Sequence, residues 1–318
     1  MNLHKPKFWD FKKPNFLAYL LLPLSLLIKA NIFFSKLYPK KKFKKIKTIC
    51  IGNIYLGGTG KTPTTLKLYQ LLKNINYSVV NGKKYYFRQE DEYVLLKNKS
   101  KVISLRNRDE IIKHAIEKNY EVIIFDDGLQ EKKLDYDLKF VCFDSEKWIG
   151  NGLLIPAGPL REEINSLRKY DGVFLKVTNR SVDLNKIKLN IKNINPKIEV
   201  FDTYVKIKNI ERFSISNKYL IFSGIGNSTS FKEILENNNF IISEEKIFTD
   251  HYDYKIQDIQ KILEIAKYKG LKILTTEKDY IKIPHDLKSK INFIEIDLEI
   301  PKKDKLIKFI KSKIDERN

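Results

Sequence analysis

The sequence feature that most constrains the fold is a glycine-rich loop, residues 52–63, that separates an apolar run from an amphipathic segment. The run 46–51 predicts a buried strand, and the segment 64–72 predicts a helix. The glycines of the loop let the backbone bend tightly and direct its N–H groups at phosphate oxygens; they are Gly57, Gly58 and Gly60. The order strand, loop, helix therefore predicts a phosphate-binding loop in an α/β fold.

The residues that end this loop indicate a nucleotide triphosphate site. Lys61 follows Gly60 at the offset that lets its ammonium group reach the β- and γ-phosphates, and Thr62 can place its hydroxyl on a magnesium ion. Thr59 stands between the last two glycines. A structural glycine turn would explain the glycines but not Lys61 and Thr62. Tyr55 occupies a position where the strict pattern has glycine, so the entry to the loop departs from that pattern.

Length and composition allow an α/β protein of two domains with an N-terminal extension. The chain has 318 residues, 31% of them charged, and a formal net charge of +21 that comes from lysines spread along its length. We expect an N-terminal segment at 1–45, a P-loop (Rossmann-like) kinase domain at 46–205 and a smaller α/β domain at 206–318. The two cysteines, Cys50 and Cys142, lie in apolar runs and are typical of buried side chains in a reducing cytosol.

The N-terminal segment predicts contact with a membrane. Residues 16–28 are apolar apart from Ser25, and a helix of this length rises about 20 Å, less than the roughly 30 Å hydrocarbon core. Lys29 follows it, and a polybasic patch occupies 40–45. We expect a helix that lies in, or partly enters, the cytoplasmic face of an anionic membrane, with Pro23 as a kink or break. The alternative is a core helix that covers the nucleotide domain.

A second strong signal is the apolar strand 121–127, which ends in Asp126 and Asp127. An acidic residue at the carboxyl end of such a strand holds magnesium in P-loop folds, and the sequence leaves open which aspartate does so. A polar loop is expected at 81–92. The Gly/Pro loop 151–160 is expected to lead into a helix that carries Arg161 and Glu162.

The rest of the chain predicts further α/β structure. Strands are expected at 77–80, 102–105, 138–143, 171–177, 219–222, 241–248 and 272–276, and helices at 107–118, 258–268, 302–315 and from Ser230 onward. The segments 200–208 and 293–300 alternate between apolar and polar residues, and we expect them to pair as a ribbon that joins the domains.

Several stretches together resemble one family, the tetraacyldisaccharide 4′-kinases. The most specific are Asp126-Asp-Gly-Leu-Gln130 and Pro156-Ala-Gly-Pro-Leu-Arg-Glu162. The others lie in the same order as in the family, at 52–63, 91–92, 150–152, 224–227, 250–251 and 275–279. The resemblance implies a membrane-associated kinase that uses ATP and Mg²⁺ and phosphorylates the 4′-hydroxyl of a lipid A disaccharide precursor.

The resemblance also implies roles for individual residues. Asp91 and His251, one from each expected domain, would activate the acceptor hydroxyl, so that domain closure would assemble the site. Lys61 and Thr62 would serve the phosphates and the metal. Gln130, Arg108 and Arg161 would bind the nucleotide, and the acidic metal shell would comprise Asp126, Asp127 and Glu162.

The sequence departs from the family at three places, and two other functions compete. Val80-Asn-Gly-Lys83 replaces Ser-Arg-Gly-Tyr, Glu131 replaces a histidine, and Ser228 replaces a proline. One rival is a GTPase or ligase with a soluble substrate, although no guanine-reading Asn-Lys-x-Asp is present. The other is a nucleic-acid NTPase, but the lysines are diffuse and form no basic stripe with interleaved aromatic residues. We therefore expect no nucleic-acid partner, and the sequence does not give the oligomeric state.

Overall fold

The computed structural model describes residues 5–35, 37–85, 90–178 and 182–315. Their contacts divide the chain into two compact units, each of which is described separately. The larger unit contains 5–85, 100–204 and 300–315 of these residues, and the smaller unit contains 90–99 and 205–299. Residues 86–89, part of the predicted loop 81–92, lie outside the described residues.

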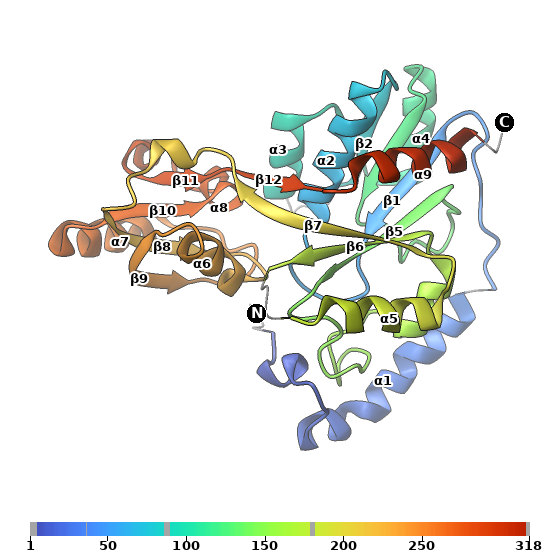
Figure 1. Cartoon of the computed structure of the whole chain (residues 1–318), viewed down its shortest axis with the longest axis horizontal. Helices are drawn as coiled ribbons and strands as arrows, with labels where there is room; N and C mark the ends of the chain where they lie inside the picture. Colours follow the sequence, from blue (N-terminus) through green and yellow to red (C-terminus); the bar gives the residue numbers. More distant parts are fainter. Residues whose placement is uncertain (1–4, 36, 86–89, 179–181, 316–318) are drawn as a thin grey trace. The chain divides into compact units, whose positions relative to one another are not determined.

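The larger unit is built on a parallel sheet with the strand order β7-β6-β5-β1-β4-β2-β3 (Figure 1). Its strands are β1 (Lys47–Gly52), β2 (Val79–Lys84), β3 (Val102–Leu105), β4 (Val122–Asp126), β5 (Leu138–Asp144), β6 (Gly172–Val177) and β7 (Glu199–Ile207), the last of which continues into the smaller unit. Its helices are η1 (Lys7–Asp10), α1 (Phe16–Ser35), α2 (Lys61–Asn74), α4 (Arg108–Glu117), η2 (Ile164–Lys169), α5 (Leu184–Ile194) and α9 (Lys303–Asp315).

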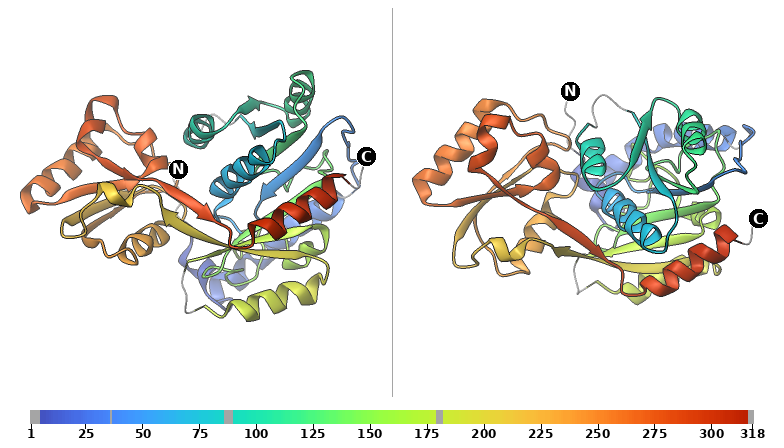
Figure 2. Two further views of the ribbon diagram at one scale, coloured as in Figure 1. Left: turned by 45° about the horizontal axis from the view of Figure 1, so that its top comes forward. Right: turned by 90° about the horizontal axis from the view of Figure 1, so that it is seen from above.

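Helices cover both faces of this sheet (Figure 2). On one face, Ile111 and Ile112 of α4 pack with Phe125, and Ile187 and Ile191 of α5 pack beneath β5 and β6. On the other face, a row of phenylalanines joins the strands to α9: Phe140, Phe174, Phe201 and Phe309. Because helices cover both faces of the sheet, each strand carries apolar side chains on both of its faces. The strands therefore appear in the sequence as continuous apolar runs.

The smaller unit has a second parallel sheet with the order β11-β10-β8-β9. Its elements are α3 (Glu90–Lys99), η3 (Ile210–Arg212), β8 (Lys218–Ser223), α6 (Ser228–Glu236), β9 (Ile241–Ile247), α7 (Ile256–Lys269), β10 (Lys272–Thr276), α8 (Glu277–Ile281), η4 (His285–Lys290), β11 (Asn292–Ile294) and β12 (Ile296–Glu299). The predicted α/β class with parallel sheets is confirmed.

Two predicted elements need correction. The segment 293–300 forms two short strands, because Glu295 interrupts it: its carbonyl accepts a hydrogen bond from Lys208 N at 2.8 Å. β11 pairs with β10, and β12 is the neighbour of β7, so the predicted pairing of 200–208 is confirmed only for β12. In the predicted loop 81–92, β2 extends to Lys84 and α3 begins at Glu90.

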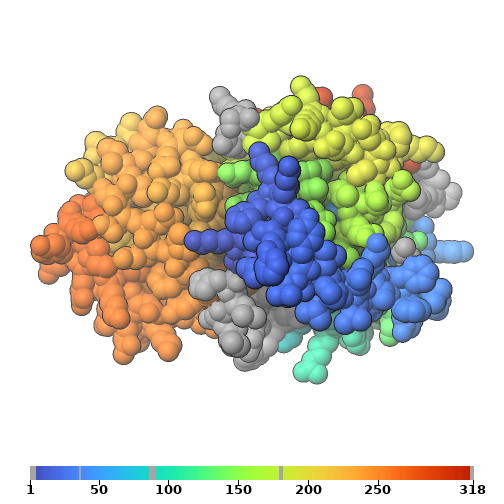
Figure 3. Space-filling view, turned by 90° about the horizontal axis from the view of Figure 1, so that it is seen from below, coloured from blue at the N-terminus to red at the C-terminus, as the bar shows by residue number. Residues whose placement is uncertain are grey.

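Helix α1 is longer than the sequence predicted. It spans 20 residues, with Pro23 inside it, and thus rises about 30 Å. Lys29 does not end it, because lysine is a good helix former, and its ammonium group pairs with Glu163 at 2.7 Å. By length and composition α1 could cross a membrane, and only 11% of its most apolar window is buried. Figure 3 shows the blue N-terminal segment on the surface of the larger unit.

Candidate functional site

The glycine loop ends at the first turn of α2, as the sequence predicted. Gly60 has φ 85° immediately before the helix, a left-handed conformation that glycine adopts without strain. The side-chain amide of Asn53 donates to the carbonyl of Gly57 at 3.2 Å and so holds the loop closed. Gly57, Gly58, Thr59 and Gly60 therefore lead directly into the N-terminus of a helix, where backbone N–H groups and the helix dipole favour an anion.

Asp126 and Asp127 lie beside this loop because β4 is the neighbour of β1. The hydroxyl of Thr62 donates to Asp126 Oδ2 at 3.0 Å, and the Nζ of Lys83 lies 3.0 Å from the same oxygen. Asp127 has φ 63°, a conformation that aspartate tolerates better than most residues. Its carboxylate faces Lys61 at 3.9 Å and Arg161 at 3.2 Å.

The charges around Asp127 keep it ionised. Burial alone would raise the pKa of Asp127, but the neighbouring Lys61, Arg161 and Lys83 outweigh burial and hold this pKa below its usual range. The site thus contains a partly exposed carboxylate that stays negative at neutral pH, next to lysines that a phosphate chain can use.

Arg161 and Glu162 are positioned by a loop that pairs with the glycine loop. Leu56 N donates to the carbonyl of Pro159 at 2.8 Å, and Arg161 N donates to the carbonyl of Ile54 at 2.6 Å. The sequence prediction of a helix that carries these two residues is wrong: they lie in an irregular segment, and the 3₁₀-helix η2 begins only at Ile164. This segment is therefore held in place by two backbone hydrogen bonds to the glycine loop and not by the backbone hydrogen bonds of a helix.

Gln130 connects the parts of this cluster. Its side-chain amide donates to the carbonyl of Asn53 at 3.1 Å and to Glu162 Oε1 at 3.0 Å, and its oxygen accepts from Arg161 at 3.2 Å. Glu162 is buried and also accepts hydrogen bonds from Tyr170 at 2.9 Å and Lys169 at 2.7 Å. Gln130 and Glu162 therefore form one network with the aspartates.

Arg108 supports the aspartate turn from the adjacent helix α4. Its guanidinium donates to the carbonyl of Asp127 and to Glu131 Oε2, the latter at 2.9 Å. Burial raises the pKa of Glu131, but the Arg108 charge and backbone hydrogen bonds lower it below the usual range. Glu131, which departs from the family pattern, thus has a partner of its own in this chain.

The residues around Asp126 fit a magnesium ion. Asp126 Oδ1 is buried and has no hydrogen-bond partner among the described residues, and the Thr62 hydroxyl contacts the other carboxylate oxygen. No group of three acidic, histidine or cysteine side chains suited to a metal is found in the described part of the chain. This pattern suits Mg²⁺, which commonly takes one or two protein oxygens and completes its shell with water and phosphate.

The predicted pair of Asp91 and His251 forms within the smaller unit. The Nδ1 of His251 lies 3.1 Å from both carboxylate oxygens of Asp91. Because an ionised carboxylate only accepts, Nδ1 donates, and Nε2 is left to accept from Lys278 Nζ at 3.3 Å. His251 has φ 57°, and its backbone N–H donates to the carbonyl of Gly224 at 3.2 Å. Helix α3 brings Asp91 to this position by packing against α8.

Two lysines that the sequence did not single out complete this cluster. Lys278 Nζ lies 3.6 Å and Lys282 Nζ 3.7 Å from Asp91 Oδ2. Burial would raise the pKa of Asp91, but the hydrogen bond from His251 and the two lysine charges lower it below its usual range. Asp91 and His251 belong to the same unit, so domain closure is not needed to bring them together, contrary to the expectation from sequence. Lys278 could have been noticed, since it lies in the block 275–279 that carried the resemblance.

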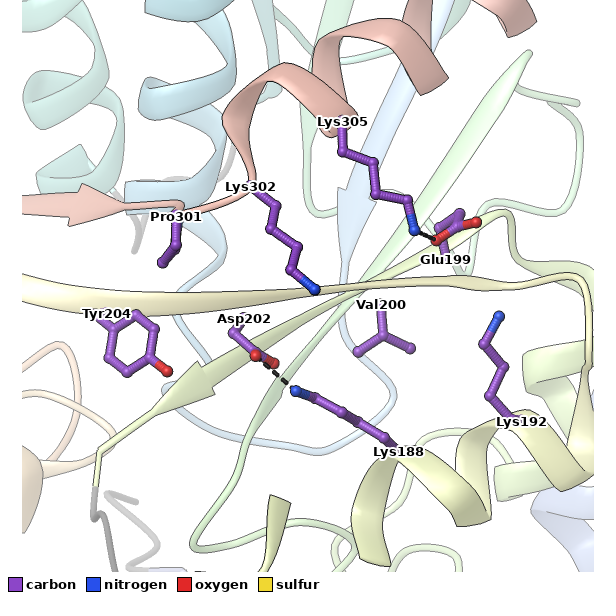
Figure 4. A pocket seen from close by; sticks show the side chains of 9 residues that line it. All are labelled: Lys188, Lys192, Glu199, Val200, Asp202, Tyr204, Pro301, Lys302 and Lys305. Carbon is purple, nitrogen blue, oxygen red and sulfur yellow. Dashed lines mark hydrogen bonds and ion pairs between the residues drawn. The ribbon is translucent and has the colours of Figure 1, made fainter. Parts of the chain in front are cut away.

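A separate lysine-lined pocket of about 320 Å³ lies between α5 and α9, across β7 (Figure 4). Lys305 pairs with Glu199 and Lys188 pairs with Asp202, each at 2.6 Å. None of the predicted site residues lines it. A second cavity, of about 460 Å³, lies between Lys29 and Ile32 of α1 and the segment that begins with Glu162.

Comparisons with known proteins cover almost the whole chain. The family description tetraacyldisaccharide-1-P 4′-kinase matches residues 17–315. A tetraacyldisaccharide 4′-kinase of Pelagibacter ubique is 44% identical over 302 residues, which cover 94% of this chain and 95% of the relative. That of Rickettsia canadensis is 35% identical over 94% of both chains. LpxK from Aquifex aeolicus, solved in complex with ATP, superposes with a TM-score of 0.69 at 24% identity and covers 94% of this chain and 99% of that one.

Proposed function

Because the chain belongs to the tetraacyldisaccharide 4′-kinase family, we propose that it transfers the γ-phosphate of ATP to the 4′-hydroxyl of a tetraacyldisaccharide 1-phosphate. The comparisons confirm the family resemblance noted in the sequence. The acceptor substrate of the kinase is a precursor of lipid A. The observation that carries the assignment of residues is the cluster in which Thr62 contacts Asp126 and Lys61 faces Asp127, at the end of the glycine loop.

We assign the nucleotide to the larger unit. The backbone of Gly57 to Gly60, with Thr59, would hold the phosphates, and Lys61 would neutralise the β- and γ-phosphates. Arg161 and Gln130 would contact the nucleotide from the neighbouring loop. Arg108 would add positive charge and keep the aspartate turn in place.

Thr62 and Asp126 would hold Mg²⁺, with Asp127 and Glu162 as the outer acidic shell. When bound, Mg²⁺ neutralises charge on the phosphate oxygens of ATP. The protein's own contribution is to keep Asp127 ionised, through Lys61 and Arg161, and to orient Glu162, through hydrogen bonds from Gln130 and Tyr170.

Asp91 would accept the proton of the acceptor hydroxyl, and His251 would orient it. Phosphoryl transfer passes through a loose transition state, so the base takes its proton late and needs correct position more than high basicity. A carboxylate with a lowered pKa that is fixed by His251 suits this role.

We propose that α1 contacts the membrane in which the lipid acceptor lies. We further propose that the enzyme works at the cytoplasmic face of the inner membrane. Large apolar side chains of α1 are exposed, among them Phe16 at 80%, Leu20 at 65% and Leu27 at 67%. Exposed lysines at 40–45 would bind anionic lipid, at about 1 kcal/mol each. The cavity between α1 and Glu162 supports an approach of the lipid substrate from the side of this helix.

The test of the transfer reaction is labelling of a tetraacyl disaccharide 1-phosphate in mixed micelles by γ-labelled ATP. Lys61→Ala should abolish lipid labelling, and Asp91→Ala should reduce it to a small residual rate. Their matched controls are Lys73→Ala, at the exposed end of the same helix α2, and Asp286→Ala, whose side chain is 99% exposed. Labelling that survives Lys61→Ala, or ATP hydrolysis with no labelled lipid, would contradict the assignment.

The test of membrane contact is co-sedimentation with vesicles. Leu20→Glu with Leu27→Glu should release the protein from anionic vesicles, because charge on the exposed face of α1 cannot enter the interface. Leu189→Glu, a leucine of α5 that is 61% exposed, is the control. Equal release by the control and the double variant would argue against α1 as the membrane-contacting element.

A further inference from the structure

Lys83 is a buried lysine whose ammonium group lies against the proposed metal-binding carboxylate. Its side chain is 4% exposed and that of Asp126 is fully buried, with 3.0 Å between Nζ and Oδ2. A buried ammonium group is strongly unfavourable unless it is paired with a charge and hydrogen-bonded. Asp126 is the direct partner of Lys83, and the charge of Lys83 also acts on Asp127.

The local sequence brings this lysine to the aspartate. β2 and β4 are parallel neighbours with Gly82 opposite Phe125, so the next residues, Lys83 and Asp126, stand side by side. A Cβ on Gly82 would lie 2.7 Å from the Phe125 ring, so glycine permits the close approach. This is the stretch where Val80-Asn-Gly-Lys83 departs from the family pattern.

The two oxygens of Asp126 are in different states. Oδ2 accepts hydrogen bonds from both Lys83 and Thr62, each at 3.0 Å. Oδ1 is buried without a hydrogen-bond partner among the residues described. Oδ2 is thus held in place and its negative charge is compensated, while Oδ1 remains available to bind a cation.

We propose that Lys83 is a positioning residue for the kinase, an internal counter-ion of Asp126. It fixes the orientation of this carboxylate before the metal–nucleotide complex binds, and its positive charge weakens the affinity of the nucleotide-free site for a divalent cation. The protein then takes its metal chiefly together with ATP, whose phosphates supply the missing negative charge. This inference rests on the proposed metal role of Asp126.

The test is Mn²⁺ binding to the full-length, nucleotide-free protein in detergent, followed by electron paramagnetic resonance. Lys83→Met keeps the side-chain volume and removes the charge, so Mn²⁺ should bind about tenfold or more tightly, as expected for the loss of one charged hydrogen-bonded contact. Lys83→Arg should restore weak binding. Lys84→Met, on the same strand with its side chain on the other face, is the control.

Kinetics separate a positioning role from a structural one. In Lys83→Met the Mg²⁺ concentration for half-maximal phosphate transfer should fall while kcat also falls, whereas a general loss of structure would lower kcat without tighter metal binding. If Lys83→Met does not fold, Lys83→Met with Asp126→Asn, which removes both buried charges, should fold and bind Mn²⁺ weakly.

Unchanged Mn²⁺ affinity in folded Lys83→Met, or equal effects of Lys83→Met and Lys83→Arg, would overturn the proposal. So would a double variant that binds Mn²⁺ as tightly as Lys83→Met. The Mn²⁺ measurement needs neither acceptor nor turnover. A failure of the lipid-labelling assay therefore does not change its outcome, and an unchanged Mn²⁺ affinity in an active enzyme refutes this inference alone.

Discussion

The contact between Asp91 and His251 predicts a double-mutant cycle with a specific outcome. If His251 acts through Asp91, removal of Asp91 leaves His251 nothing to act on. Asp91→Ala with His251→Ala should then be no slower than Asp91→Ala alone. His251→Ala alone should be the milder single change, because Lys278 and Lys282 still lie 3.6 Å and 3.7 Å from Asp91 Oδ2 and keep it charged and in place.

The size of the coupling follows from the geometry. Nδ1 of His251 lies 3.1 Å from both oxygens of a carboxylate that is 3% exposed, and a hydrogen bond to a charged group contributes about 1.5–3 kcal/mol. At about 1.4 kcal/mol per factor of ten, His251→Ala should lower kcat about 10- to 100-fold. The coupling energy of the cycle should have the same magnitude.

The assay is the initial rate of lipid phosphorylation in mixed micelles at saturating ATP, with melting temperatures measured in parallel. His285→Ala is the matched control, since the His285 side chain is 99% exposed in the same unit. Losses that add fully in the double variant would refute the reasoning, because independent residues give no coupling. So would a control that lowers kcat as much as His251→Ala.

Other perturbations have outcomes that the structure also determines. Lys278→Met removes a charge that lowers the pKa of Asp91 while burial still raises it, so this pKa rises and the acid limb of the kcat/KM profile moves to higher pH. Gly158→Ala puts a Cβ 2.5 Å from the Leu153 carbonyl oxygen, so urea denaturation should show a loss of about 1–3 kcal/mol or more. Ser25→Val leaves the buried Ala157 N without its hydrogen-bond acceptor, whereas Leu154 O keeps the hydrogen bond from Gly158 N, so the variant should lose about 1–3 kcal/mol in the same measurement; Ser35→Val is its control.

Strands and motif residues were predictable because local sequence determines them. β3 begins and ends where the sequence placed it, and β1 and β4 differ by about a residue, since apolar runs between polar turns define buried parallel strands. The cluster of Lys61, Thr62 and Asp126 was predictable for a similar reason: two linear motifs end adjacent strands of one sheet.

Elements that depend on tertiary contacts were not predictable. Helix α3 begins with Glu90-Asp-Glu and has no apolar face that marks a helix, and it packs on α8 instead. The sequence predicted α1 to end before Lys29, but lysine is a good helix former and the helix continues to Ser35. Helix α5 did have a signal that was missed, since Ile187 and Ile191 lie one turn apart and both are buried.

The cations around the two key carboxylates differ in a way that matches their proposed tasks. Asp126 has to receive a metal ion, and among the residues that the structure describes one lysine contacts Oδ2 while Oδ1 has no hydrogen-bond partner. Asp91 has to receive a proton, and His251 contacts both of its oxygens while two lysines stand further away. The direct ion pair from Lys83 competes with a metal ion for Asp126, whereas the charges of Lys278 and Lys282 add to the hydrogen bond from His251 in lowering the pKa of Asp91. Substitution of Lys83 should therefore change metal binding first, and substitution of Lys278 should change the pH profile first.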